Sequence, residues 1–202
     1  MNALANDKVG TLLNRYFVAS FQRVGSFRIN NGQKQGGNVA AYFCAPDGRV
    51  LHAVAGPVDA NTLLAEAEWV IGKTKEALSA SKGDGTKFKQ LMRRYHAEHL
   101  QAKHGVRVTP VLRDQVGQDL ATALAYRDAQ GRRLAPVLSL PPIENPAAVK
   151  NPLSNDAQVH RLLAAHATMR IEGLYGAIFE GILGEKVTTK PVQADSPFAR
   201  RK

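Results

Sequence analysis

Residues 38–56 read NVAAYFCAPDGRVLHAVAG and predict two apolar strands joined by a tight turn. Apolar side chains occupy both alternating faces of residues 39–44, which is typical of a strand covered on both sides in an α/β layer. The sequence APDG predicts the turn, because Pro46 presets φ at its first central position and Gly48 closes it. His52 lies in the second strand. It is expected to be a packed or edge histidine rather than a ligand, since no partner is visible in the neighbouring sequence.

A long helix is predicted directly after the hairpin, over residues 60–78. Asp59 stands in the N-cap position, where its carboxylate can accept hydrogen bonds from the first backbone N–H groups. Apolar residues recur at helical spacing, so the helix is expected to lie on the sheet, with Trp69 as a core anchor. Glu66 and Glu68 are expected to face water. They are two positions apart and point to different sides, so they predict no paired acid–base site.

The segment before the hairpin is predicted as a helix, a strand and a loop. The helix covers residues 5–13, with Asn6 or Asp7 as its N-cap. The strand covers residues 17–24, where side chains alternate between two faces. Residues 25–37 are rich in Gly, Asn and Gln. Their glycines match neither phosphate-binding motif and do not open onto a helix, so an ordinary surface loop is expected there.

Residues 6–78 resemble the C-terminal portion of a thioredoxin-like domain. The resemblance rests on an LN-x-x-FV segment that begins at Leu13, the P-D-G turn at residues 46–48, the strand RVLHAVAG and the helix after it. It implies the ββα arrangement with which thioredoxin-like proteins end. The fold class predicted for the chain is therefore α/β, with a partial thioredoxin-like sheet-and-helix domain and a mainly helical C-terminal extension.

The chemistry of the redox-active members of that family is not carried by this sequence. Those members place a CxxC motif at the start of the helix that precedes the LN-x-x-FV segment, where this chain has residues 1–5 and no cysteine. They also place a cis-proline before the first hairpin strand, where this chain has Gly36, Gly37 and Asn38. Cys44 is predicted to be a lone thiol at the far end of that strand, without the resolving partner that disulfide exchange needs.

The central strand of a full thioredoxin-like sheet has no counterpart before the LN-x-x-FV segment. Three arrangements stay open: the protein starts upstream of Met1, a later strand fills the gap, or the fold has rearranged. Candidate later strands are residues 106–112 and 134–140. A helix is predicted between them, over residues 114–126.

A basic amphipathic helix is predicted over residues 87–103, ending at Gly105 and following a flexible connector at residues 79–86. Its expected apolar face consists of Phe88, Leu91, Met92, Tyr95 and Leu100. Its candidate contacts with an anion or a partner are Lys87, Lys89, Arg93 and Arg94. Interleaved basic and aromatic residues suit a nucleic-acid backbone. An ordinary docking helix has the same pattern and is the preferred interpretation.

The same helix carries the densest group of histidines in the chain. His96 and His99 are one helical turn apart and close enough to share a metal ion, with His104 or a distant residue as a third ligand. The sequence HAEH lacks the spacing of HExxH, however, and solvated histidines are the preferred interpretation. No GxSxG motif is present. The sequence therefore assigns no catalytic, cofactor-binding or metal-binding residues.

The resemblance and the composition together predict five segments. They are a thioredoxin-like domain (1–80), a basic helix with a mixed α/β extension (81–140), a linker (141–156), a helical segment (157–185) and a flexible basic tail (186–202). Asp156 is expected to cap the last helix, which breaks near Gly173. The formal net charge is +10, of which residues 1–80 contribute +2 (8 basic and 6 acidic residues) and residues 81–202 contribute +8 (19 and 11).

These patterns favour a non-catalytic thioredoxin-fold protein that acts in interaction or scaffolding, with another protein as its partner. The first alternative is a thiol–disulfide redox protein whose cysteine motif lies upstream of Met1. The second is nucleic-acid binding by residues 87–103. A single cysteine and the lack of a basic, apolar leader suggest a cytoplasmic protein, or an exported one if the true start is upstream. No run of 18 apolar residues predicts a membrane span.

Overall fold

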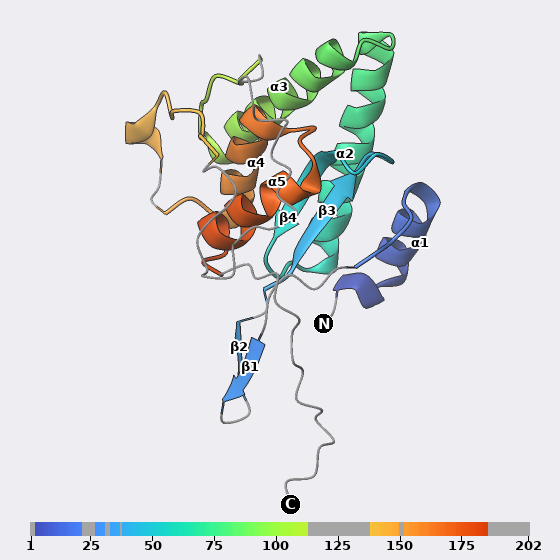
Figure 1. Ribbon diagram of the computed structural model, residues 1–202, viewed down its shortest axis with the longest axis vertical. Helices are drawn as coiled ribbons and strands as arrows, with labels where there is room; N and C mark the ends of the chain where they lie inside the picture. Colours follow the sequence, from blue (N-terminus) through green and yellow to red (C-terminus); the bar gives the residue numbers. More distant parts are fainter. Residues whose placement is uncertain are drawn as a thin grey trace, which may run out of the picture.

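The computed structural model describes residues 3–21, 27–30, 33–36, 38–112, 138–149 and 152–185. Its regular elements are η1 (Ala3–Ala5), α1 (Asp7–Tyr16), β1 (Phe27–Asn30), β2 (Gln33–Gly36), β3 (Ala40–Cys44), β4 (Val50–Ala55), α2 (Ala60–Ser81), α3 (Gly85–His104), η3 (Pro146–Ala148), α4 (Asn155–His166), α5 (Ile171–Gly176) and the π-helical η4 (Ala177–Ile182). Figure 1 shows the β3–β4 hairpin in the middle of the molecule, while β1 and β2 form a separate hairpin away from the body. The described chain is thus mixed α/β.

The central hairpin is confirmed. Strands β3 and β4 pair antiparallel, with Phe43 opposite His52 and a register shift after Phe43. In the turn, the N–H of Gly48 donates to the carbonyl of Ala45 at 2.9 Å, and Gly48 adopts a φ of +81° that favours glycine. All six residues of β4 are buried, because α2 and α4 both pack against this strand. The sequence expectation of a strand covered on both sides concerned residues 39–44, but in β3 only Phe43 is buried and its neighbours are partly exposed.

A short segment from the C-terminal part lies along the other edge of β4. The N–H of Thr168 donates to the carbonyl of Val50 at 2.7 Å, and the N–H of Val50 donates to the carbonyl of Met169 at 2.9 Å. A bridge between Arg49 and Arg170 extends this pairing. The beginning of β4 therefore has backbone partners on both edges, and the second partner comes from residues 168–170 rather than from the strands expected after residue 105.

Several predicted strands and loops are corrected. Residues 17–21 form no strand, and residues 22–24 lie outside the described part. The predicted loop at 25–37 contains the β1–β2 hairpin. In place of a strand at 106–112, there is a single bridge between Val108 and Ile143. The predicted helix at 114–126, residues 134–137 of the later strand and the tail at 186–202 lie outside the described residues.

Helix capping explains where the long helices begin and end. Asp59 accepts from the N–H of Thr62 at 2.7 Å, as predicted, and α2 continues to Ser81. Asp84 then caps α3, so the expected flexible connector at 79–86 is wrong and a tight turn joins the two helices. Gly105 ends α3 in the left-handed conformation, as predicted. At the N-terminus, Asn6 rather than Asp7 is the cap of α1.

The last helices also differ from the expectation at their ends. Ser154, not Asp156, caps α4, because its hydroxyl accepts from the N–H of Ala157 at 3.2 Å. The helical break lies at residues 167–170, where Thr168 has a φ of +69°, and Gly173 sits inside α5. With Ser154 as the cap, the side chain of Asp156 is available for contacts with α3.

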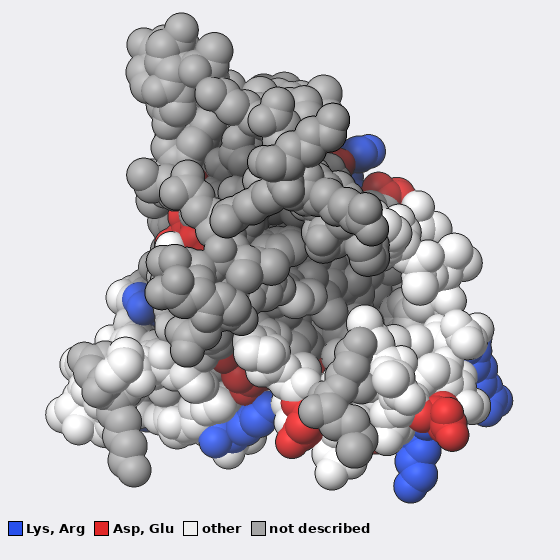
Figure 2. Space-filling view, turned by 90° about the horizontal axis from the view of Figure 1, so that it is seen from below, with Lys and Arg blue, Asp and Glu red and all other residues white. Residues whose placement is uncertain are grey.

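One hydrophobic core runs across the division predicted at residue 80. Its buried members include Val54 of β4, Val70 of α2, Met92 of α3 and Leu163 of α4. A smaller cluster between α3 and α4 lies beside it. No helix among the described residues is long and apolar enough to cross a membrane. On the face shown in Figure 2, basic and acidic side chains of the described residues lie intermixed.

Candidate metal centre

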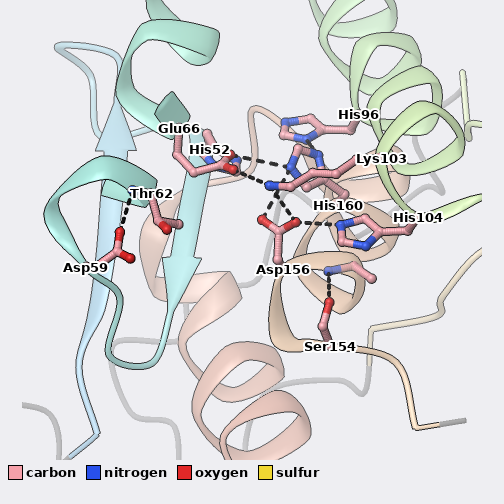
Figure 3. A network of polar contacts seen from close by, with 11 residues as sticks. His52, Asp59, Thr62, Glu66, His96, Lys103, His104, Ser154, Asp156 and His160 are labelled. Carbon is pink, nitrogen blue, oxygen red and sulfur yellow. Dashed lines mark hydrogen bonds and ion pairs between the residues drawn. The ribbon is translucent and has the colours of Figure 1, made fainter. Parts of the chain in front are cut away.

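A cluster of buried titratable side chains lies where β4, α2, α3 and α4 meet. His52 of β4, His96 of α3 and His160 of α4 are 0 % exposed, and Glu66 of α2 is 2 % exposed. Buried charged groups are costly unless they are paired or bind a cation. Figure 3 shows these side chains pointing toward one another from four different elements.

Helical spacing directs the remaining members into the same region. On α3, His96, His99 and Lys103 follow at intervals of three and four residues and so share one face. On α4, Asp156 and His160 are four residues apart, and the Nε2 atom of His160 lies 3.9 Å from Oδ1 of Asp156. The ring of Trp69 on α2 forms a wall of the site, with its centroid 4.9 Å from the centroids of both His96 and His99.

Hydrogen bonds assign the tautomers of two buried histidines. Nε2 of His96 lies 2.9 Å from the carbonyl oxygen of Leu51, which can only accept, so this nitrogen carries a hydrogen. Neutral His96 therefore has a bare Nδ1, which lies 2.9 Å from Nδ1 of His160. Nδ1 of His160 must then be the donor. In neutral His160, Nε2 therefore carries a lone pair and no proton.

That bare nitrogen faces a carboxylate. Nε2 of His160 lies 3.7 Å from Oε2 of Glu66, and Nε2 of His52 lies 3.0 Å from the same oxygen. Neither contact meets the geometry of a hydrogen bond, and all three atoms are buried without a hydrogen-bond partner among the described residues. Two lone pairs directed at the same space repel each other, whereas a cation between them would attract both.

The other oxygen of Glu66 has a partner. Nζ of Lys103 donates to Oε1 of Glu66 at 2.6 Å and lies 3.0 Å from Oδ2 of Asp156. Nε2 of His104 donates to the same Asp156 oxygen at 2.6 Å. The side chain of Lys103 is 40 % exposed and that of Asp156 is 30 % exposed. These residues therefore form the solvent side of the cluster.

The protonation states follow from burial and from these contacts. Burial lowers the pKa of His160 to about 3 and holds the pKa of His96 well below its ordinary value. Burial also lowers the pKa of His99. Burial opposes the charge of Glu66, but its contacts with proton-donating neighbours, among them the ammonium group of Lys103, outweigh this and lower its pKa. At neutral pH the site thus holds neutral imidazoles beside an ionised carboxylate, which are the forms that bind metal ions.

Two overlapping sets of side chains have one potential ligand atom each within 4.8 Å of one another. They are His52, His96 and His160, and Glu66, His99 and His160. Atoms bound to one Zn²⁺ at about 2.0–2.1 Å lie at most about 4.2 Å apart. The 3.7 Å between Glu66 and His160 fits this limit. The second set is the better one, because both nitrogens of His96 already take part in hydrogen bonds.

Several expectations about these residues are wrong. His96 is buried and His99 is half-buried, so neither is a solvated histidine. Of the two glutamates Glu66 and Glu68, which were both expected to face water, Glu66 is buried and Glu68 is exposed. His52 is packed, as expected, but it has partners far away in the sequence. His104 contacts Asp156 rather than joining His96 and His99 around one point.

The predicted basic contacts divide between surface and core. Arg93 is 3 % exposed and donates to the carbonyl of Val111 at 2.8 Å, so it is not a surface contact. Lys87 is exposed and Lys89 is half-buried. Arg94 is exposed, where it pairs with Glu98 at 3.4 Å. Of the expected apolar face, Leu91, Met92 and Leu100 are buried, while Phe88 and Tyr95 are partly buried against the core.

Cys44 should alkylate slowly. Burial, then the carboxylates of Glu172 and Asp47, raise the pKa of its thiol to about 11. Only the thiolate is a good nucleophile, so iodoacetamide should modify Cys44 at pH 7.5 roughly 100-fold more slowly than it modifies glutathione. The rate should keep rising up to about pH 11. A pH–rate profile that levels off below pH 9, measured by mass spectrometry, would contradict this environment.

No family model, curated protein or solved structure matches the chain. The chemistry of the site therefore has to be inferred from its own atoms.

Proposed function

We propose that this protein binds one divalent transition-metal ion, of the zinc class, through Glu66, His99 and His160. The observation that carries the proposal is the bare Nε2 of His160, fixed by the contacts from Leu51 through His96 and directed at Oε2 of Glu66. Imidazole nitrogen combined with one carboxylate oxygen suits Zn²⁺ and its neighbours, whereas Mg²⁺ and Ca²⁺ prefer oxygen ligands alone.

One neighbouring residue supports a ligand as an outer partner. His96 accepts from the Nδ1–H of His160 and so fixes that ligand's tautomer, which is the usual arrangement of a metal-binding histidine. Oε1 of Glu66 accepts from Lys103, so the oxygen offered to the ion is Oε2. Three protein ligands leave a fourth position of a tetrahedral ion for water or another donor. The ion would tie α2, α3 and α4 together.

Cobalt binding tests this proposal. Co²⁺ added to chelator-treated protein should give visible absorption bands that saturate at one equivalent and disappear on addition of Zn²⁺. His99→Gln and Glu66→Gln should each weaken binding at least about 100-fold, because each removes a ligand. Glu98→Gln is the matched control, since Glu98 is an exposed carboxylate beside His99 that pairs outward with Arg94. Its affinity should stay within about threefold of the unsubstituted protein.

Unchanged cobalt affinity in His99→Gln, with the fold intact by circular dichroism, would overturn the ligand set. Lack of any binding by the unsubstituted protein would overturn the function.

The scaffold and interaction function is a second proposal. What supports it is the order of β3, the P-D-G turn, β4 and α2, which is the order on which the thioredoxin-like resemblance rests. The raised pKa of Cys44 gives no support to the redox alternative. The burial of Arg93 removes one of the four basic residues on which the nucleic-acid alternative rests.

A further inference from the structure

We infer that Lys103 acts as an internal cation that competes with the metal ion for the site. This inference rests on the proposed function and concerns its regulation. Lys103 bridges the two carboxylates of the cluster, at 2.6 Å from Oε1 of Glu66 and 3.0 Å from Oδ2 of Asp156. Figure 3 shows its ammonium group between these two side chains, next to His160.

Charge makes the two cations antagonists. Glu66 and Asp156 bring two negative charges, and Lys103 neutralises one of them. A divalent ion on Oε2 of Glu66 would share this carboxylate with the ammonium group on Oε1. Like charges repel at such short range. The carboxylate that attracts the metal ion is therefore the same carboxylate that Lys103 occupies.

Lys103 is also the member of the cluster that can leave. Of the basic side chains that contact Glu66 among the described residues, those of His52 and His160 are 0 % exposed, whereas that of Lys103 is 40 % exposed. Its stem has four flexible carbons, so the ammonium group can move into water without breaking the core. Withdrawal of Lys103 would release Glu66 and open the solvent side of the site.

The opposite role makes the opposite prediction. A lysine that merely orients Glu66 for metal binding would be an outer partner, and its removal would weaken affinity. A competing cation would be harmful to binding, and its removal would strengthen affinity. The sign of the change in affinity therefore separates the two roles.

The experiment compares Lys103→Met, Lys103→Arg and Lys87→Met with the unsubstituted protein by competition between Zn²⁺ and a chromophoric chelator. Methionine keeps the stem length without the charge, so Lys103→Met should bind Zn²⁺ about 10-fold more tightly. Lys103→Arg keeps the charge and should stay within about threefold. Lys87→Met is the matched control, because Lys87 is exposed on the same helix and its loss changes the net charge equally. Its affinity should change less than about twofold.

Equal or weaker Zn²⁺ binding by Lys103→Met would overturn the competition, even if the unsubstituted protein binds zinc and His99→Gln does not. In that case the proposed function survives and only this inference fails. If neither the unsubstituted protein nor Lys103→Met binds Zn²⁺, both fail. Tighter binding by Lys87→Met to the same extent would show a general effect of net charge and would also overturn the inference.

Discussion

Zinc at 100 times its dissociation constant should raise the free energy of unfolding by about 2.7 kcal/mol. The reason is that the proposed ligands come from three helices, α2, α3 and α4, and reach one point only in the folded chain. An ion that binds the native state and not the unfolded state stabilises the native state by mass action. For a chain of this size the midpoint of thermal unfolding should rise by roughly 5–10 °C.

Calorimetry or circular dichroism of chelator-treated protein, with and without Zn²⁺, measures this rise. Mg²⁺ at the same concentration is the ionic control and should give almost no shift, because it prefers six oxygen ligands. His99→Gln should lose the increment. His99 is only half-buried, so this variant is expected to fold without metal. An equal rise in His99→Gln would place the stabilising ion elsewhere in the protein.

Local signals predict the scaffold well. The P-D-G turn, the alternation on both of its sides and the cap at Asp59 each depend on neighbours within a few residues. They fix β3, β4 and the start of α2, and Gly105 likewise fixes the end of α3. The pairing of residues 168–170 with β4 has no such signal, because a bridge between Arg49 and Arg170 depends on how the whole chain folds back.

The candidate site was missed because its polar residues look like surface residues. Glu66 reads as a solvated charge, yet it shares a helical face with the buried Leu63, Ala67 and Val70. That position is the signal that was available: a carboxylate in the middle of an apolar stripe needs a partner. The partners, Lys103 and His160, are far away in the sequence, so their identity follows only from the fold.

Arg93 of the basic helix was likewise expected at the surface and is buried. Arg93 was grouped with exposed basic residues because arginine is rarely buried. It follows Met92 directly, however, and its guanidinium reaches the carbonyl of Val111. Without the contact from residue 111, sequence cannot tell this arginine from its exposed neighbour Arg94.

Acidification should strongly destabilise the metal-free protein, beginning near pH 6.5. Burial holds the pKa of His160 at about 3 and that of His96 well below its ordinary value. Below about pH 6.5 the unfolded chain therefore binds protons that the folded chain does not bind. The free energy of unfolding then falls by about 1.4 kcal/mol per pH unit for each such group. His160 alone gives a loss of roughly 2 kcal/mol between pH 6.5 and pH 4.5, and His96 adds to this loss.

The sign of this dependence is the same for each group of the cluster whose pKa is lowered. A group whose folded pKa is depressed contributes stability at high pH and loses it as the pH falls. Glu66 and Asp156, whose pKa values are also lowered, extend the loss to pH values below about 4.5. Stability should therefore be flat from about pH 7 to 8 and fall steadily below that range.

Urea unfolding in the presence of a chelator, at half-unit steps from pH 7.5 to pH 4.5, measures how the free energy of unfolding changes with pH. The change per pH unit is the slope. His160→Gln should reduce the slope by about 1.4 kcal/mol per pH unit, whatever it does to the stability at pH 7.5, because glutamine does not titrate. Glu98→Gln should leave the slope unchanged between pH 6.5 and pH 5, since Glu98 is exposed and pairs only at the surface. A slope near zero between pH 6.5 and pH 4.5 would mean that the unfolded and folded chains bind equal numbers of protons there. The buried histidines would then have to be charged in the fold, and the bare nitrogen of His160 on which the metal site depends would not exist.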